Sequence, residues 1–442
     1  MSNNSKKIIA RFPPSPTGWF HIGNARTALF NYFFVKKNNG ELKFRIEDTD
    51  KERSKDEYTK DIIEGLKWLG INIDFSDIYR QSEHGDTYKK YIEKMISDGK
   101  AYISKEEAKE EGQRSEVIRL RNPNKKVVFE DMIRGEVAVD TTELGDFVIA
   151  KSTSEPIYHL AVVVDDFEMG VTHIVRGEDG IYNTPRQILI QEAIGAPRPV
   201  YAHMPFILND DRSKLSKRKQ GEMVSLKYYR EEGYLPEAMV NFLAFMGWNP
   251  GGNEEIMSIE EIIEKFDIMR VQKAGAIFNI KKLNWINKEY IKKLPKEKIL
   301  ELILKRVPEE KRAHKNFEVV YPKIIQLIEE RIEKFSDVTS IFNSGEFDCL
   351  LDAPKYDKIL LKNITHIPKL LEIIDTIDES SFDQIGLKNA IWDFATEVGR
   401  GEVLWPMRVA LSGREKSPDP FTLASILGKE ETLKRLSFAL GL

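Results

Sequence analysis

Short apolar segments alternate with amphipathic segments in the first third of the sequence, and this order restricts the fold more than any other feature. The segment KKIIARF precedes a helical pattern from about Ala25 to Lys37; ELKFRIED then precedes a second helical pattern that ends near GLKWLG. Strand–helix alternation of this kind predicts a parallel sheet with helices packed on it. Ligands of such sheets bind beyond the carboxyl ends of the strands, so we expect functional side chains there.

The pattern changes twice further along the chain. Between about Tyr79 and Tyr158 the polar segment SKEEAKEEGQRSEVIRL predicts a helix, and strand-like segments follow in KKVVFEDMIRGEVAVD and GDFVIAKS, which together indicate an inserted α+β module. The segment YHLAVVVDDFEMGVTHIVRGED then predicts two strands separated by an acidic turn, before a helix near Pro185 to Ala193 and a strand in PVYAHMPFIL. From about Ser225 onward nearly every segment has helical spacing, which predicts an all-helical rear.

The composition restricts the number of domains, the partners and the cellular location that we expect. A length of 442 residues allows about three domains. The net charge of -4 means that a nucleic-acid partner must be held by local basic surface. The single cysteine, Cys349, excludes an internal disulfide framework and a zinc site of several thiolates, which favours the cytoplasm. The segment MSNNSKKIIARF lacks the apolar core expected of a signal peptide, and no run approaches the length of about 20 apolar residues that spans a bilayer, so we expect no membrane partner.

The segment RFPPSPTGWFHIGN, which spans Arg11 to Asn24, is a stiff loop ahead of the first predicted helix. Three prolines restrict its backbone, and Gly18 and Gly23 permit a close approach to it. Asn24 is a candidate N-cap, and an anion beside His21 and Asn24 would be stabilised by the unpaired N–H groups at the helix start. The alternative is that Asn24 only caps the helix and His21 only lies at its solvated start.

An acidic cluster follows the second predicted strand. Glu47, Asp48 and Asp50 come directly after the alternating residues Leu42, Phe44 and Ile46. A carboxylate at this strand end could receive a substrate ammonium group. Asp48 and Asp50 are better suited to organising the turn and the next helix start, and a simple acidic turn remains the alternative for both.

A basic segment, DRSKLSKRKQG, lies after the last predicted strand of the sheet. Its cations are Arg212, Lys214, Lys217, Arg218 and Lys219, and turn-forming residues flank them. Such a run is often only solvated surface. A mobile loop at this place could instead close on phosphates, because preplaced cations stabilise negative charge that develops in a transition state.

Several of these segments resemble the class I aminoacyl-tRNA synthetases in their glutamyl form. PPSPTGWFHIGNARTALFNY resembles the segment with the HIGH signature, with Asn24 in place of the second histidine, and KLSKR matches the second signature, KMSKS. YHLAVVVDD and HIVRGEDGIYNTPRQ look like the middle of the same catalytic domain. PEAMVNFLAFMGW, KLNWIN and the later segment LWPMRVALSGREKSPDPFTLASILGKEETLKRL look like its stem-contact and anticodon-binding parts, so the resemblance covers the whole chain.

The resemblance implies roles for particular residues. It assigns glutamate binding to Arg11, Ser15, Glu47, Tyr158 and Arg176, and contacts to ATP to His21, Asn24, Asp179, Lys214 and Lys217. Two arginines that converge with a tyrosine favour an acidic amino acid, since a neutral amide would leave those charges underpaired. Without the motifs, the two arginines would be read as members of unrelated surface ion pairs. Mg²⁺ is expected only with the phosphates of ATP, and zinc is not expected, because no cysteine lies between Asp98 and Tyr158.

The expected fold is an α/β class I Rossmann-like catalytic domain with a parallel sheet and an inserted module, followed by an all-helical region. We expect five segments in order. Residues 1–78 form the first half of the catalytic domain, residues 79–157 an inserted module that binds the acceptor end of the tRNA, and residues 158–211 the second half of the catalytic domain. Residues 212–300 contain the basic loop and the stem-contact helices, and residues 301–442 form the helical anticodon-binding region.

The expected function is that of a ligase joining glutamate to tRNA for glutamate through glutamyl-adenylate, in a protein that the resemblance implies to be a monomer. Whether the tRNA for glutamine is also charged stays open. So do three alternatives: a shortened relative that glutamylates a modified tRNA base, a nucleotidyltransferase acting on a small metabolite, and a non-catalytic RNA-binding paralogue. Length argues against the first, because such a chain would end before the helical rear.

Overall fold

The computed structural model describes residues 7–106, 116–216, 221–356, 359–361 and 364–441. It divides into two compact units, Met1–Tyr290 and Ile291–Leu442. None of the helices in these ranges is long and apolar enough to cross a lipid bilayer. The finer division into five segments stays a prediction.

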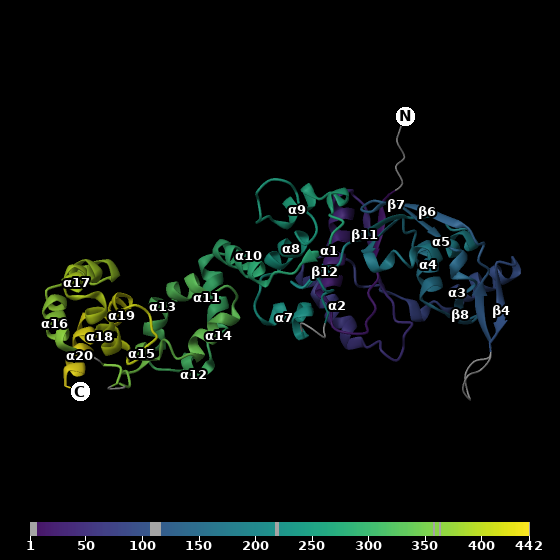
Figure 1. Ribbon diagram of the computed structural model, residues 1–442. Helices are drawn as coiled ribbons and strands as arrows, with labels where there is room; N and C mark the ends of the chain where they lie inside the picture. Colours follow the sequence, from purple (N-terminus) through teal and green to yellow (C-terminus); the bar gives the residue numbers. More distant parts are fainter. Residues whose placement is uncertain (1–6, 107–115, 217–220, 357–358, 362–363, 442) are drawn as a thin grey trace. The chain divides into compact units, whose positions relative to one another are not determined.

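The predicted parallel sheet lies in the first unit (Figure 1). Its first part contains three parallel strands in the order β1 (Ile9–Phe12), β2 (Glu41–Ile46) and β3 (Tyr79–Arg80). Its second part has the order β10 (His173–Gly177), β11 (Val200–Met204), β6 (Lys126–Asp131) and β7 (Gly135–Asp140), in which only β7 is antiparallel to its neighbour. Ile9 joins the two parts, because it exchanges backbone and side-chain hydrogen bonds with Thr172 at 2.8 and 2.9 Å.

Helices cover this sheet because their buried faces match its apolar strands. Helix α1 (Ile22–Lys37) is buried along most of its length and packs on β1, β2 and β10. The other described helices that begin in the first unit are α2 (Asp56–Trp68), α3 (Gly85–Ser97), α4 (Tyr158–Glu168), α5 (Thr184–Ile194), α7 (Leu226–Glu231), α8 (Pro236–Ala244), α9 (Ile259–Lys265) and α10 (Ile280–Lys293). One core cluster joins α1 and α8 to the sheet, and a second joins α3, α4 and α5 to a separate antiparallel sheet.

That separate sheet forms part of the inserted module. Its order is β4 (Ala101–Lys105), β5 (Glu116–Leu120), β8 (Phe147–Ser152) and β9 (Glu155–Pro156), and Figure 1 shows β4 and β8 at one end of the first unit beside α3. The predicted helix over residues 104–120 was wrong where the structure describes it, because its first and last residues lie in strands β4 and β5. A short parallel pair, β12 (Ile207–Leu208) with β13 (Ala276–Ile277), lies further along the chain.

The first of the two strands predicted in YHLAVVVDDFEMGVTHIVRGED is also a helix, α4. Val162, Val163 and Val164 are all buried there, since α4 packs against α3, α5 and β8. A helix buried on several sides shows no polar stripe, so its apolar run cannot be told from a buried strand by periodicity. The second predicted strand is β10, as expected.

The second unit contains only helices among its described residues, which confirms the predicted all-helical rear. They are α11 (Lys296–Leu304), α12 (Glu309–Arg312), α13 (Phe317–Arg331), α14 (Ser336–Asn343), α15 (Asp348–Leu351), α16 (Ile367–Asp375), α17 (Gln384–Val398), α18 (Arg400–Ser412), α19 (Pro420–Leu427) and α20 (Lys429–Leu440). Its core contains both aliphatic and aromatic side chains, and Ile328, Leu370, Val403, Phe342 and Phe347 are at most 1% exposed.

Candidate active site

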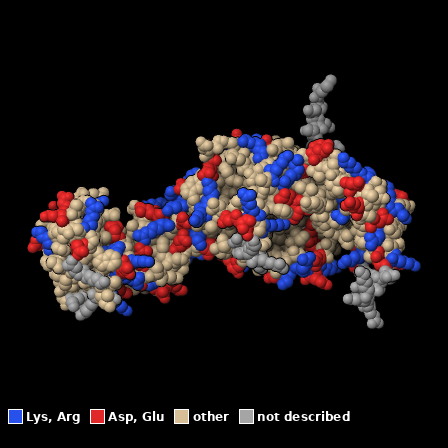
Figure 2. Space-filling view, viewed as in Figure 1, with Lys and Arg blue, Asp and Glu red and all other residues tan. Residues whose placement is uncertain are grey.

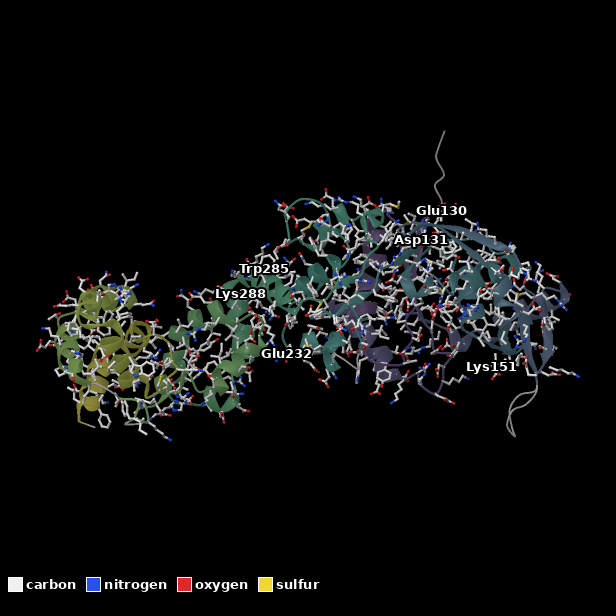
Figure 3. All side chains as sticks on the ribbon, viewed as in Figure 1. Glu130, Asp131, Lys151, Glu232, Trp285 and Lys288 are labelled. Atoms are coloured by element: carbon white, nitrogen blue, oxygen red, sulfur yellow. The ribbon has the colours of Figure 1, made fainter. Side chains whose placement is uncertain are left out.

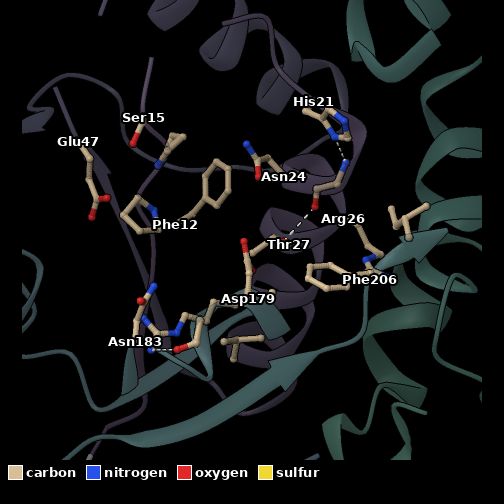
Figure 4. A pocket seen from close by; sticks show the side chains of 18 of the residues that line it. Phe12, Ser15, His21, Asn24, Arg26, Thr27, Glu47, Asp179, Asn183 and Phe206 are labelled. Carbon is tan, nitrogen blue, oxygen red and sulfur yellow. Dashed lines mark hydrogen bonds between the residues drawn. The ribbon is translucent and has the colours of Figure 1, made fainter. Parts of the chain in front are cut away.

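A cleft of about 450 Å³ opens at the carboxyl ends of β1, β2 and β10, beside the start of α1. All predicted site residues that the structure describes line it: Arg11, Ser15, His21, Asn24, Glu47, Tyr158, Arg176, Asp179 and Lys214. Lys217 lies outside the described residues. In the view of Figure 4, Ser15 and Glu47 lie to the left, His21 to the right, and Asn24 between them. The cleft therefore has two ends with different chemistry.

The start of α1 forms one end of the cleft. The N-cap is His21, whose Nδ1 accepts a hydrogen bond from the Gly23 backbone N–H at 2.9 Å, so the prediction of Asn24 as N-cap was wrong. The helix begins earlier because Ile22 is fully buried and extends the apolar face by one turn. Asn24 is thereby free to line the cleft with its side chain.

His21 is a neutral hydrogen-bond donor toward the cleft. Burial, and then the nearby Lys214 ammonium, hold the pKa of His21 below its usual range. Since Nδ1 accepts from Gly23, the proton of the neutral ring is on Nε2. A ring in this tautomer can donate to an anionic oxygen without carrying a charge of its own.

Lys214 and Asp179 face each other on another side of the cleft. The Lys214 ammonium lies 3.9 Å from the Asp179 carboxylate and 4.1 Å from the centre of the Phe206 ring. Both charged side chains are more than half exposed, so this ion pair contributes little to stability. The backbones of Leu208 and Lys214 pair as an isolated antiparallel β-bridge. This pairing holds the described part of the basic loop, so Lys214 lines the cleft.

The opposite end of the cleft contains a buried network of charges. The Arg11 Nε donates to both oxygens of Asp166 at 3.2 Å. Arg45 donates to Asp166 at 2.8 Å and to Glu47 at 2.9 Å, so Asp166 joins the two arginines. Burial alone would raise the pKa of Asp166, but Arg11 and Arg45 together hold it below its ordinary value. Asp166 is therefore a carboxylate that fixes Arg11 beside the cleft.

Glu47 remains available as an acceptor on the cleft side of this network. Only its Oε1 bonds to Arg45, and burial raises the pKa of its carboxyl despite that arginine. A cationic group in the cleft would lower the pKa again. Asp50 organises its turn as predicted, because its Oδ1 accepts from the Arg53 backbone N–H and its Oδ2 from the Arg53 side chain. Asp48 instead accepts from the backbone N–H and the hydroxyl of Ser82, which lies 34 residues further along the chain, so its predicted role in the turn was wrong.

Arg176 is a buried cation whose hydrogen-bond partners are all neutral. Its Nε donates to His203 Nε2 at 3.1 Å, and its Nη2 donates to the Gly180 carbonyl, Thr184 Oγ1 and Gln187 Oε1 at 2.8 to 3.1 Å. Its Nη1 is buried and has no hydrogen-bond partner, although Arg176 lines the cleft. Burial accordingly lowers the pKa of this guanidinium from its usual value. An anionic ligand at Nη1 would satisfy both the orphaned donor and the charge.

Tyr158 lies at the start of α4 and not beside a strand as predicted, because the segment that contains it is helical. Its ring still lines the cleft. Partial burial, and then the Glu47 carboxylate, raise the pKa of its phenol, so the hydroxyl stays protonated and able to donate. The structure thus brings Tyr158 and both arginines to one cleft.

Some residues of the site escaped the sequence-based prediction. Asp166 lies in the segment predicted to be an acidic turn, and Arg45 lies in no motif, although a charged residue within an apolar strand is a sign of a buried ion pair. Thr27 and Asn183 also line the cleft, but single polar residues of this kind carry no sequence signal. No cluster of three or more His, Cys, Asp and Glu side chains suited to a metal occurs in the described part of the chain.

Comparison with known proteins agrees with this arrangement. The family model for the catalytic domain of class I tRNA synthetases (E and Q) matches residues 7–111 and 103–285, and a model for an anticodon binding domain matches residues 279–440. A glutamate–tRNA ligase of Carboxydothermus hydrogenoformans is 39% identical over 97% of this chain and 99% of its own length. A glutamate–tRNA ligase of Aquifex aeolicus is also 39% identical, over 97% of this chain and 98% of its own length.

Solved structures extend the likeness to three dimensions. The crystal structure of a glutamate tRNA ligase from Elizabethkingia meningosepticum in complex with its amino acid has a TM-score of 0.82 and 32% identity, and the match covers 99% of both chains. A glutamate–tRNA synthetase from Elizabethkingia anophelis has a TM-score of 0.81 at 32% identity. Both domain models and the full-length relatives lead to one assignment. The chain belongs to the class I tRNA synthetases, and within them to the glutamate–tRNA ligase family.

Proposed function

We propose that this protein activates L-glutamate with ATP and transfers the glutamyl group to the 3′ end of the tRNA for glutamate. The observation that carries the proposal is the buried Arg176 guanidinium, which lines the cleft with neutral partners only and one orphaned nitrogen. A buried cation without a carboxylate partner carries an energetic cost, which a ligand that supplies negative charge would offset. An acidic amino acid is such a ligand.

The glutamate end of the cleft would contain Arg11, Arg176, Tyr158, Ser15 and Glu47. The two guanidinium groups would bind a carboxylate, with the Tyr158 hydroxyl as a further donor. The Glu47 carboxylate and the Ser15 hydroxyl would receive the ammonium of the substrate. Glutamine would leave the arginine charges uncompensated, at a cost of several kcal/mol, which accounts for selection of glutamate.

The ATP end would contain His21, Asn24, Lys214, Asp179 and Lys217. The start of α1 together with His21 and Asn24 would donate hydrogen bonds to phosphate oxygens, and Asp179 would contact the ribose. Lys214 and Lys217 would stabilise negative charge that develops when a glutamate carboxylate oxygen attacks the α-phosphorus and diphosphate leaves. Mg²⁺ would enter with ATP and neutralise part of the same charge.

The transfer step would need only positioning. A hydroxyl of the terminal tRNA ribose attacks the activated carbonyl carbon, AMP leaves, and the hydroxyl proton goes to the departing phosphate or to water. No covalent enzyme intermediate is required, so catalysis depends on orientation and charge stabilisation.

The tRNA would contact both units, since the catalytic and anticodon-binding models match successive parts of the chain. Lys and Arg side chains alternate with Asp and Glu over the visible face, with no field of one sign (Figure 2). Binding would therefore rely on local basic groups and on stacking and edge contacts to unpaired anticodon bases. We propose a monomer for which tRNA binding precedes productive glutamate activation. Charging of the tRNA for glutamine is a second proposed activity.

The test is pyrophosphate exchange with L-glutamate, measured with and without tRNA, followed by charging of the two purified tRNAs. The proposal expects exchange that depends on glutamate and increases strongly with tRNA. Exchange that ignores tRNA would indicate an enzyme acting on a small metabolite, and absence of exchange a non-catalytic RNA-binding protein. Glutamylation of a modified tRNA base instead of the 3′ end would indicate the third alternative.

A further inference from the structure

A buried chain of hydrogen bonds runs from Asp131 through His203 to Arg176. The Asp131 Oδ2 lies 2.6 Å from His203 Nδ1, and His203 Nε2 lies 3.1 Å from Arg176 Nε. Asp131 and His203 side chains are fully inaccessible. Asp131 ends β6, as labelled in Figure 3, while His203 lies in β11 directly opposite Arg176 in the register of β10. Three adjacent strands thus hold the three groups in line.

The direction of these hydrogen bonds follows from chemistry. The Nε of an arginine always carries a hydrogen, so His203 Nε2 can only accept from Arg176. The proton of the neutral ring is then on Nδ1, where it donates to Asp131. Thr184 Oγ1, at 3.2 Å from Nε2, has the Gly180 carbonyl as its own acceptor at 2.9 Å.

The surroundings of Asp131 keep it ionised and fixed. Its Oδ1 accepts from the backbone N–H groups of Ile133 and Arg134 at 3.0 and 2.8 Å, and its Oδ2 accepts the backbone N–H of His203 at 3.0 Å. Burial works against the charge, yet His203 and these N–H groups hold the pKa of Asp131 below its ordinary value. A fixed carboxylate at Nδ1 leaves no freedom in the choice of histidine tautomer.

The guanidinium plane of Arg176 is consequently determined by its contacts. Nε is bound to His203 and Nη2 is bound to three acceptors, so Nη1 alone is left for a ligand. We propose that His203, held as its Nδ1–H tautomer by Asp131, is a positioning residue. It orients Arg176 for the amino-acid carboxylate, and this orientation sets the affinity for glutamate and its preference over glutamine. The inference rests on the function proposed above.

The orientation of Arg176 affects the affinity for glutamate because a guanidinium group binds a carboxylate through directional hydrogen bonds in its own plane. If the proton of His203 were on Nε2, this N–H would face the N–H of Arg176 Nε. The two donors would repel each other, and the guanidinium group would rotate away. A comparable fixing of a histidine tautomer by a buried carboxylate operates in serine protease triads, where replacing the carboxylate by an amide disturbs function more than structure.

Two variants of one position provide the test. His203→Gln can place an amide oxygen near the former Nε2 and keep an acceptor for Arg176, whereas His203→Asn reaches only as far as the former Nδ1 and loses it. Pyrophosphate exchange in the presence of tRNA gives the KM for glutamate and for ATP separately. H203N is expected to raise the KM for glutamate about tenfold to a hundredfold, the value of one hydrogen bond to a charged group. The KM for ATP should stay unchanged, and H203Q should recover most of the loss.

Asp131→Asn is the second, independent perturbation. Both oxygens of Asp131 face backbone donors, so the NH₂ group of an asparagine cannot replace either without meeting an N–H. In Asp131→Asn the histidine is no longer held as the Nδ1–H tautomer, so this variant is expected to raise the KM for glutamate as H203N does. This variant also keeps the test decisive if H203N fails to fold.

Specific outcomes overturn the inference. Equal KM values for glutamate in H203Q and H203N, or a parallel rise in the KM for ATP, would show that His203 has a general structural role. An unchanged preference for glutamate over glutamine in H203N and D131N would have the same meaning. Failure of the proposed function is distinguishable, because the unaltered protein would then show no exchange dependent on glutamate.

Discussion

Replacement of Asp166 by asparagine tests the central charge network of the site. The carboxylate accepts from Arg11 at 3.2 Å and from Arg45 at 2.8 Å, and all three side chains are at most 6% exposed. Asparagine has nearly the same shape, so the substitution creates no cavity. It removes the charge that both guanidinium groups face and places an NH₂ group against one of them.

The expected loss in the free energy of unfolding is about 3 to 5 kcal/mol, the cost of leaving a buried charge without its partner. Glu47 and Asp165 compensate Arg45 in part, at 2.9 and 3.7 Å, whereas Asp166 is the carboxylate that pairs with Arg11 among the described residues. The effect should therefore extend to function, as a raised KM for glutamate, because Arg11 is no longer fixed beside the cleft.

Urea denaturation of D166N and of the unaltered protein measures the loss, and Asp50→Asn is the matched control. Asp50 pairs with Arg53 at 2.5 Å, but the two side chains are 38% and 73% exposed, so its loss should cost less than about 1 kcal/mol. The pKa of Asp166 is lowered in the folded state, so its contribution is present above about pH 4 and disappears as the pH falls further. A loss in D166N no larger than in D50N, or one independent of pH, would refute the reasoning.

Three further predictions concern single side chains. Lys217→Ala should raise the activation barrier by on the order of 2 to 4 kcal/mol, measured as kcat in pyrophosphate exchange, and an unchanged kcat would remove Lys217 from the site. Arg11→Ala should abolish use of glutamate while ATP binding, measured by calorimetry, is largely kept; undiminished charging would contradict the assignment of the pocket. Burial, then Arg186 and Arg176, lower the pKa of His159 to about 4, so folding stability should fall as the pH drops from about 6.5 toward 4. His159→Gln should flatten that part of the unfolding profile, and an unaltered slope would show that the ring does not titrate as described.

The sequence predicted those parts of the molecule in which local pattern and tertiary role coincide. Strand β2 alternates apolar and polar residues, strand β1 is mostly apolar, and α1 follows a loop that its prolines stiffen, so both the sheet and the cleft position were predictable. Nine of the ten proposed ligand-binding residues line one cleft, and the resemblance of the motifs groups the same residues from the sequence.

Other parts depended on partners far away in the chain. The run Val162 to Val164 is helical because α3, α5 and β8 enclose it, and nothing in its own composition shows this. Likewise β6 and β7 belong to the insertion by sequence but extend the main sheet through β11. Asp131 and His203 carry no signal in the sequence, because their role depends on a hydrogen bond between two strands and the two residues are 72 positions apart.

The junction between Ile9 and Thr172 has a consequence for synthesis. Strand β1 leaves the ribosome early, but the backbone that completes its second side is encoded about 160 residues later. At roughly 5 to 20 residues per second, that side stays open for about ten to thirty seconds. During this interval an unpaired strand edge can join a neighbouring nascent chain. Codons that slow elongation before Thr172 would lengthen the exposure, and they should increase aggregation of newly made protein without altering a single amino acid.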